Sequence, residues 1–169
     1  MKFTLLLPLL AALFLSACVT PPTGREVVRR QPKPGKRVKV VERMTVRTTA
    51  YTHTEAGGRK NAIGGRLRFG GDTSSAASDW SWLPLGTRFR LAETGRIYVI
   101  EDYGSALVGK KTVDLYMPTR RSMNAWGVKN VEIEILEWGS RAMSLKLLEG
   151  RQRSRYVRAM VYSLRKGKT

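Results

Sequence analysis

Apolar and polar residues alternate along the middle of the chain, and this pattern predicts a series of short strands. Because successive side chains of a strand point to opposite faces, each such segment can bury one face and leave the other in contact with water. Residues 131–135, Val-Glu-Ile-Glu-Ile, show the pattern most plainly. The predicted strands cover residues 38–51, 87–91, 97–100, 112–117 and 131–135.

A short helix is predicted at residues 118–127, where Pro118 stands near the start and Gly127 at the end. At least five short strands with one short helix predict an all-β barrel or sandwich in a single domain at residues 40–138. The C-terminal tail, residues 139–169, contains two further helical segments. Seven basic residues and no acidic ones follow Gly150, so we expect this tail on the surface or against a membrane.

The N-terminus has the parts of a secretion signal. Lys2 precedes an apolar run at residues 3–15, which is shorter than the roughly 20 residues of a spanning helix. Leu-Ser-Ala-Cys, ending at Cys18, looks like the lipobox of bacterial lipoproteins, which implies a signal peptide at residues 1–17 and lipidation of Cys18. A Pro-rich basic tether at residues 18–39 would follow. We expect a lipid-anchored monomer, in the outer membrane and facing the periplasm.

The chain is strongly basic, with 31 Lys plus Arg against 13 Asp plus Glu and a formal net charge of +18. Such an excess indicates a polyanionic partner. Export argues against nucleic acid and leaves the cell wall and anionic lipid head groups. Cys18 is the one cysteine, so the sequence permits no internal disulfide.

Candidate chemistry centres on residues 97–116, which are predicted as a strand, a glycine loop and a second strand, with Asp102 and Asp114 beside the loop. The loop matches Gly-x-x-x-x-Gly-Lys. However, Lys111 stands where a phosphate-binding loop has Ser or Thr, and a strand follows instead of a helix. We therefore predict no nucleotide and no other cofactor. By themselves, two loop-flanking aspartates serve either catalysis or turn capping.

Histidine and tryptophan are two further candidate residue types for the site. His53 is the one histidine in the chain, and no nucleophile motif or second metal-ligating histidine accompanies it, which favours a hydrogen-bonded or solvent-facing role. Tryptophans could stack on sugars or fill the core. The best candidates for stacking are Trp80 and Trp82, because alternate residues of a strand would share one face.

The chain resembles the 3D domain family, which is named for three aspartates. The resemblance extends over about residues 48–138 and covers the segments 49–51, 77–79, 84–87, 102–109, 113–116, 125–127 and 131–136. It identifies Asp79, Asp102 and Asp114 as the three aspartates. It implies a six-stranded double-psi β-barrel like the catalytic domain of membrane-bound lytic transglycosylase A.

This resemblance implies a peptidoglycan-cleaving activity on the bond between N-acetylmuramic acid and N-acetylglucosamine. Asp114 would be the catalytic acid/base and Asp102 its neighbour, raising the pKa of Asp114 by like-charge repulsion. Asp79, Thr87, Tyr116, Trp80 and Trp82 are the expected substrate-binding residues, and glycan strands the partner. The alternative is a non-catalytic lipoprotein that binds peptidoglycan through the same groove.

Overall fold

The computed structural model describes residues 39–55 and 58–167. The predicted signal peptide, Cys18 and the tether up to residue 38 lie outside this part of the chain, and their roles stay predictions. None of the helices in the described segments is long and apolar enough to cross a membrane.

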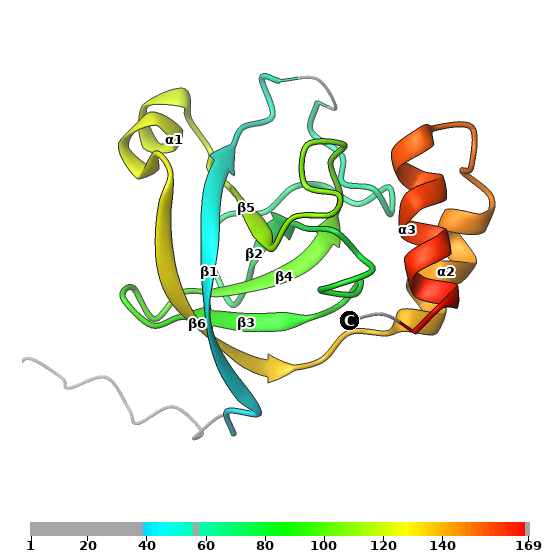
Figure 1. The fold of residues 1–169 in the computed structure, drawn as a ribbon. Helices are drawn as coiled ribbons and strands as arrows, with labels where there is room; N and C mark the ends of the chain where they lie inside the picture. The colour runs from blue at the N-terminus through cyan, green and yellow to red at the C-terminus, as the bar shows by residue number, and fades with distance from the viewer. Residues whose placement is uncertain (1–38, 56–57, 168–169) are drawn as a thin grey trace, which may run out of the picture. The chain divides into compact units, whose positions relative to one another are not determined.

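Six strands form a closed barrel in the order β1-β5-β2-β4-β3-β6 (Figure 1). The strands are β1 (Glu42–Tyr51), β2 (Ser74–Ala77), β3 (Arg88–Leu91), β4 (Ile97–Asp102), β5 (Thr112–Tyr116) and β6 (Lys129–Glu137). The pairs β1–β5 and β2–β4 are parallel and the other four are antiparallel. The predicted fold class is confirmed, because a closed, mixed six-stranded barrel is the architecture of a double-psi β-barrel.

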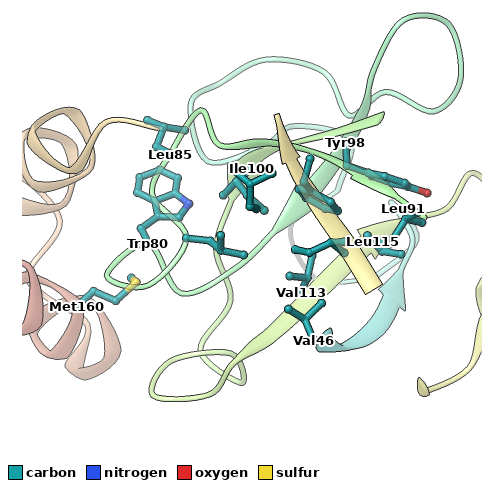
Figure 2. Packing of buried hydrophobic residues seen from close by; sticks show 14 of the residues in the cluster. Val46, Trp80, Leu85, Leu91, Tyr98, Ile100, Val113, Leu115 and Met160 are labelled. Carbon is teal, nitrogen blue, oxygen red and sulfur yellow. The ribbon is translucent and has the colours of Figure 1, made fainter. Parts of the chain in front are cut away.

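The alternation along each strand separates a buried inner face from an outer face. On β5, Val113 and Leu115 are fully buried, whereas Asp114 between them is half-buried. On β1, Val46 and Thr48 point inward. The outward-facing residues are Thr45, Arg47, Thr49 and Tyr51. Figure 2 shows inner-face residues of several strands packed together. The core therefore decides which face of β5 carries Asp114.

Strand β2 is absent from the strands predicted from sequence. Its residues, Ser-Ser-Ala-Ala, are all buried, so no alternation of burial marks them. Small side chains on both faces let this short strand lie between β4 and β5, to which it is hydrogen-bonded on its two edges. The strand that the sequence does not reveal is thus the one that separates the strands of Asp102 and Asp114.

The short helix α1 (Arg120–Trp126) follows the predicted boundaries. Thr119 caps its N-terminus with a capping box to Ser122, and Gly127 ends it at φ 64°. Its placement beside β1 is secured by Trp126, whose indole N–H donates to Oγ1 of Thr48 over 3.2 Å. Lys129 lies over the same indole ring, 3.8 Å from its centroid.

The C-terminal tail forms two helices, α2 (Arg141–Glu149) and α3 (Arg155–Arg165). The expectation of a surface or membrane-bound tail requires correction. Leu148 of α2 and Met160 of α3 are fully buried and belong to the same apolar cluster as the barrel residues. In Figure 2, Trp80 lies between the barrel residues and Met160. Burial of each such side chain stabilises the fold by about 1.5–3 kcal/mol, while the basic side chains of these helices remain largely exposed.

Candidate functional site

Four residues on neighbouring strands form a row across the outer face of the barrel. Ala77 of β2 is the partner of Asp102 on β4 and also of Asp114 on β5, and Asp114 is in turn the partner of Thr49 on β1. Paired residues on adjacent strands point to the same face of a sheet. The row Asp102, Ala77, Asp114, Thr49 therefore places both predicted catalytic aspartates on one face, separated by a methyl group.

A β-bulge in β4 brings Asp102 into this row. Ala76 pairs with Ile100, but the next residue, Ala77, pairs with Asp102, so Glu101 is the extra residue of β4. Glu101 is buried and is bonded to the hydroxyl of Ser75 and the guanidinium of Arg68. Bulges redirect side chains in this way beside functional sites.

The row faces a cavity of about 160 Å³. Its lining includes the outer-face residues Ala77, Asp102 and Asp114, and the connection between β1 and β2 supplies part of its wall through Glu55 and Lys60. This connection therefore borders the cavity. The remaining lining residues are Tyr51, Thr52, Gly58, Leu67, Tyr103, Gly104 and Leu107.

The pKa of Asp114 is raised above its usual value. Burial is the main cause, and the hydrogen bond from Thr49 Oγ1 to Asp114 Oδ1, 2.7 Å long, opposes it by stabilising the carboxylate. The charge of Glu55 raises the pKa further and that of Arg47 lowers it. Asp114 is thus a half-buried carboxyl group that holds its proton to higher pH than a solvated aspartate.

The pKa of Asp102 is raised to about 6, again mainly by burial. Hydrogen bonds from the backbone N–H groups of Tyr103 and Ala62 lower it, and the charges of Glu101 and Asp114 raise it. The predicted rise in the pKa of Asp114 through the charge of Asp102 is not found, whereas the charge of Asp114 does raise the pKa of Asp102. At Asp114 the like-charged neighbour is Glu55.

Two hydroxyl groups of the cavity lining have no hydrogen-bond partner among the described residues. They are Tyr51 Oη and Thr52 Oγ1, and both atoms are buried. Burial raises the pKa of Tyr51 far above its usual value, and the charges of Asp102 and Asp114 add to that rise. Tyr51 is therefore a neutral donor beside the two carboxyl groups. Sequence reasoning assigned it no role, although it is an outward-facing residue of β1 in a segment of the family resemblance.

Tyr116 and His53 lie beside this site. Tyr116 follows Asp114 by two residues on β5 and so points to the same face. Its hydroxyl is 2.9 Å from Nδ1 of His53, and its ring makes an edge contact with Tyr51, with 5.6 Å between the centroids. The prediction of a hydrogen-bonded histidine is confirmed. Tyr116 is buried and supports Tyr51 from the side.

Asp79, the third aspartate, does not share the cavity of the other two. It is buried, with Oδ1 accepting from the backbone and hydroxyl of Ser81. Its Oδ2 accepts from the backbone N–H of Gly109 over 2.8 Å. The carboxylate therefore ties the glycine loop to the turn after β2. This structural contact holds the loop that carries Tyr103 and Leu107, and a substrate contact of Asp79 stays a prediction.

Two expectations of substrate contact require correction. Trp80 is fully buried, and its indole N–H donates to the backbone oxygen of Asp102 over 2.9 Å. Thr87 is fully buried too, donating to Pro84 O and accepting from the N–H of Gly139. Neither side chain can reach a sugar, and Trp80 instead positions the backbone of Asp102.

Trp80 and Trp82 were expected on one face of a strand, but they lie in a turn. The backbone N–H groups of Trp82 and Leu83 both donate to the carbonyl oxygen of Asp79. Trp82 is half-buried and lines a groove that it shares with Asp79 and with Val108 and Gly109 of the glycine loop. Of the predicted tryptophan pair, Trp82 alone is accessible.

The glycine loop itself connects two strands, as its sequence predicts. Gly109 adopts φ 76°, and β5 begins at Thr112 with no helix whose N-terminus could hold phosphate. Within residues 39–55 and 58–167, no group of three or more His, Cys, Asp or Glu side chains is placed to hold a metal ion. The polar side chains that line the cavity carry carboxyl, hydroxyl and amino groups.

Residues 74–137, the segment that contains Asp79, Asp102 and Asp114, match the model of the 3D domain family. The match runs from β2 to β6 and leaves β1, with Thr49 and Tyr51, outside it. Two proteins of Bacillus subtilis (strain 168) are similar to this chain over 94 residues, or 55% of its length.

The first of these relatives, YabE, is provisionally named a cell wall shaping protein; it is 35% identical, and the match covers 23% of its chain. The second, YocH, is named a cell wall-binding protein; it is 31% identical, and the match covers 32% of its chain. The chain thus spans less than a third of the length of either relative.

Proposed function

We propose that the protein cleaves the glycan strands of peptidoglycan, at the β-1,4 bond between N-acetylmuramic acid and N-acetylglucosamine. The observation that carries this proposal is the row of Asp102, Ala77 and Asp114, which presents two carboxyl groups of raised pKa to one cavity. The 3D domain match and the names of the two relatives support the cell wall as substrate.

In the proposed reaction Asp114 is the acid/base. Its protonated carboxyl group gives its proton to O4 of the leaving N-acetylglucosamine while the C1–O4 bond breaks and oxocarbenium character develops at C1. The resulting carboxylate takes the proton from the C6 hydroxyl of N-acetylmuramic acid, and a C1–O6 bond forms. The product is a 1,6-anhydro sugar, and no water nucleophile is needed, unlike in two-carboxylate hydrolysis.

The neighbours of Asp114 have distinct parts in this reaction. Thr49 holds the carboxyl group in place. Asp102, once ionised, lies on the same face and stabilises positive charge at C1. Tyr51 offers a neutral hydroxyl without a protein partner, suited to a hydrogen bond with a sugar hydroxyl or carbonyl group.

The cellular location of the protein is part of the same proposal. Lipidation at Cys18 would anchor the chain in the outer membrane, with the barrel facing the periplasm and the peptidoglycan. The formal net charge of +18 would favour the anionic wall. Labelling of intact cells with a fatty-acid probe, for the native chain and for Cys18→Ser, tests the anchor directly.

The second candidate function is peptidoglycan binding without cleavage. The size of the cavity favours it, since about 160 Å³ is below the roughly 300–1,000 Å³ of sites that enclose a whole small ligand. The name of YocH, a cell wall-binding protein, points the same way.

The two functions are separated by incubating purified protein with sacculi and measuring both binding and soluble products. Release of anhydro muropeptides by the native protein, lost in Asp114→Asn, supports cleavage. Equal binding by both forms, without product from either, supports the binding protein. Product from Asp114→Asn but not from Asp102→Asn would assign the acid/base to Asp102, whose pKa of about 6 also permits that part.

A further inference from the structure

A second groove lies on the barrel, apart from the aspartate cavity, and two tryptophans from distant parts of the chain line it. Trp82 comes from the turn after β2, and Trp138 directly follows β6. The groove has a volume of about 480 Å³ and is also lined by Glu42, Met44, Thr45 and Lys111. We call it the tryptophan groove. It combines two aromatic rings with charged and hydroxyl side chains.

Trp138 is exposed, and the backbone next to it is tightly packed. The residue is 40% exposed, whereas Trp80 is fully buried in the core. The next residue, Gly139, packs so closely on the turn at residues 84–87 that a Cβ would come within 2.3 Å of the carbonyl oxygen of Leu85. Ser140 N–H donates to that same oxygen. The backbone that carries Trp138 is therefore held in place, so little backbone entropy is lost when a ligand stacks on its ring.

The tryptophan groove and the aspartate cavity are connected along the outer face of β1. Thr45 lines the groove, Thr49 is bonded to Asp114, and Arg47 stands between them on the same face. Four residues of a strand span about 13 Å. The register Arg47 to Thr112 places Lys111, the residue just before β5, beside this path. One extended ligand can therefore contact both sites.

The path between the two sites is positively charged. Arg47 and Lys111 are both exposed, and neither has a carboxylate partner within 4.0 Å among the described residues. Lys111 also lines the adjoining groove, of about 260 Å³, that contains Trp82 and Lys110. Unpaired cations beside aromatic rings suit a ligand with flat apolar sugar faces and carboxylate groups.

We propose that the tryptophan groove is a second glycan-binding site. Trp82 and Trp138 stack there on amino-sugar rings, and Lys111 pairs with a carboxylate of the same glycan strand. For the class of glycan, this inference rests on the function proposed above. The groove would hold the strand several sugars away from the bond at Asp114. It makes the protein a binder of long strands in preference to short fragments.

The test measures binding of the full chain to sacculi, with Asp114→Asn as the parent protein so that cleavage does not interfere. Trp138→Ala is expected to weaken binding by about tenfold, which corresponds to about 1.4 kcal/mol. Tyr162→Ala is the matched control, because Tyr162 is an aromatic residue with 57% exposure that lines none of these grooves. It should bind as the parent does.

Lys111→Gln tests the carboxylate contact, with Lys146→Gln on α2 as its control. Lys111→Gln should weaken binding to sacculi severalfold and leave binding to chitin unchanged, since the N-acetylglucosamine chain of chitin has no carboxylate. Parent-like binding by Trp138→Ala, or equal losses in a variant and its control, would overturn the inference while leaving cleavage at Asp114 intact. A parent protein that does not bind sacculi would instead overturn the proposed function itself, and this inference with it.

Discussion

Thr49 donates a hydrogen bond of 2.7 Å to Asp114, a residue 65 positions further along the chain. The parallel pairing of β1 and β5 makes this contact, since the two residues are partners in the register. Thr49 lies outside the segment that matches the 3D domain model. The strand that precedes the matched segment thus takes part in tuning the proposed acid/base.

The first prediction concerns the pH profile of Thr49→Val. The Thr49 hydroxyl lowers the pKa of Asp114 by stabilising the carboxylate, so its removal should raise that pKa. Asp114 would then keep its proton to higher pH, and the alkaline limb of the rate profile should move up by about one pH unit. Rates on sacculi from pH 4 to 9 measure this. Thr94→Val, in the turn between β3 and β4, should keep the native profile; an unshifted limb in Thr49→Val would contradict the assignment.

Ala77→Val tests the separation of the two carboxyl groups. Ala77 lies between Asp102 and Asp114 in the row, so two added methyl groups should fill the cavity and block substrate. A β-branched residue suits a strand, and because the added methyl groups enter the cavity, the cost in stability should be smaller than the roughly 1–3 kcal/mol of overpacking a filled core. We expect at least a tenfold loss of cleavage with a nearly unchanged urea midpoint. Native activity in this variant would mean that substrate does not enter between the aspartates.

Asp102→Asn should change stability in a way that depends on pH. The folded-state pKa of about 6 lies above the ordinary 3.8, so the folded protein binds the proton more tightly than the unfolded chain. Ionisation of Asp102 therefore destabilises the native protein as pH rises from about 4 through 6. The full effect, about 3 kcal/mol at most, should be present above pH 7.

Replacement by Asn removes this cost while keeping an oxygen to accept from Tyr103 N–H. Urea unfolding should find Asp102→Asn more stable than the native protein at pH 8 and equal to it at pH 4. Equal stability of the two proteins at both pH values would show that Asp102 has an ordinary pKa.

Tyr51→Phe separates a substrate contact from a structural one. The hydroxyl is buried without a described partner, so its loss should leave the urea midpoint unchanged or raised. Cleavage of sacculi should nevertheless fall by about tenfold if the hydroxyl bonds to the sugar. Unchanged cleavage would remove Tyr51 from the site, and a lowered midpoint would show a structural hydrogen bond in its place.

Strong alternation predicted the strands whose inner faces form the core, such as β6 with its Val-Glu-Ile-Glu-Ile. It could not predict β2, because Ser74–Ala77 is small and buried on both faces. For that reason the sequence pattern could not predict that Asp102 and Asp114 both pair with Ala77. It could not predict the β-bulge at Glu101 either. Both depend on register between distant strands, which local periodicity does not contain.

Several residues predicted to contact substrate are buried instead, for a related reason. Residue type suggests what Trp80, Thr87 and Asp79 can do, but not whether they are buried, and all three support the fold around the site. The basic tail shows the same limit. Its charge indicated a surface segment, whereas the apolar residues of α3, at helical spacing, pack into the core cluster.

The central claim is that Asp114 transfers the proton in glycan cleavage. The most direct measurement is mass analysis of the soluble products released from purified sacculi by the native protein and by Asp114→Asn, at equal protein bound. The account predicts 1,6-anhydro muropeptides from the native protein and at least a thousandfold less from Asp114→Asn. Equal release by the two proteins, or no product from the native protein while it binds the sacculi, would contradict it.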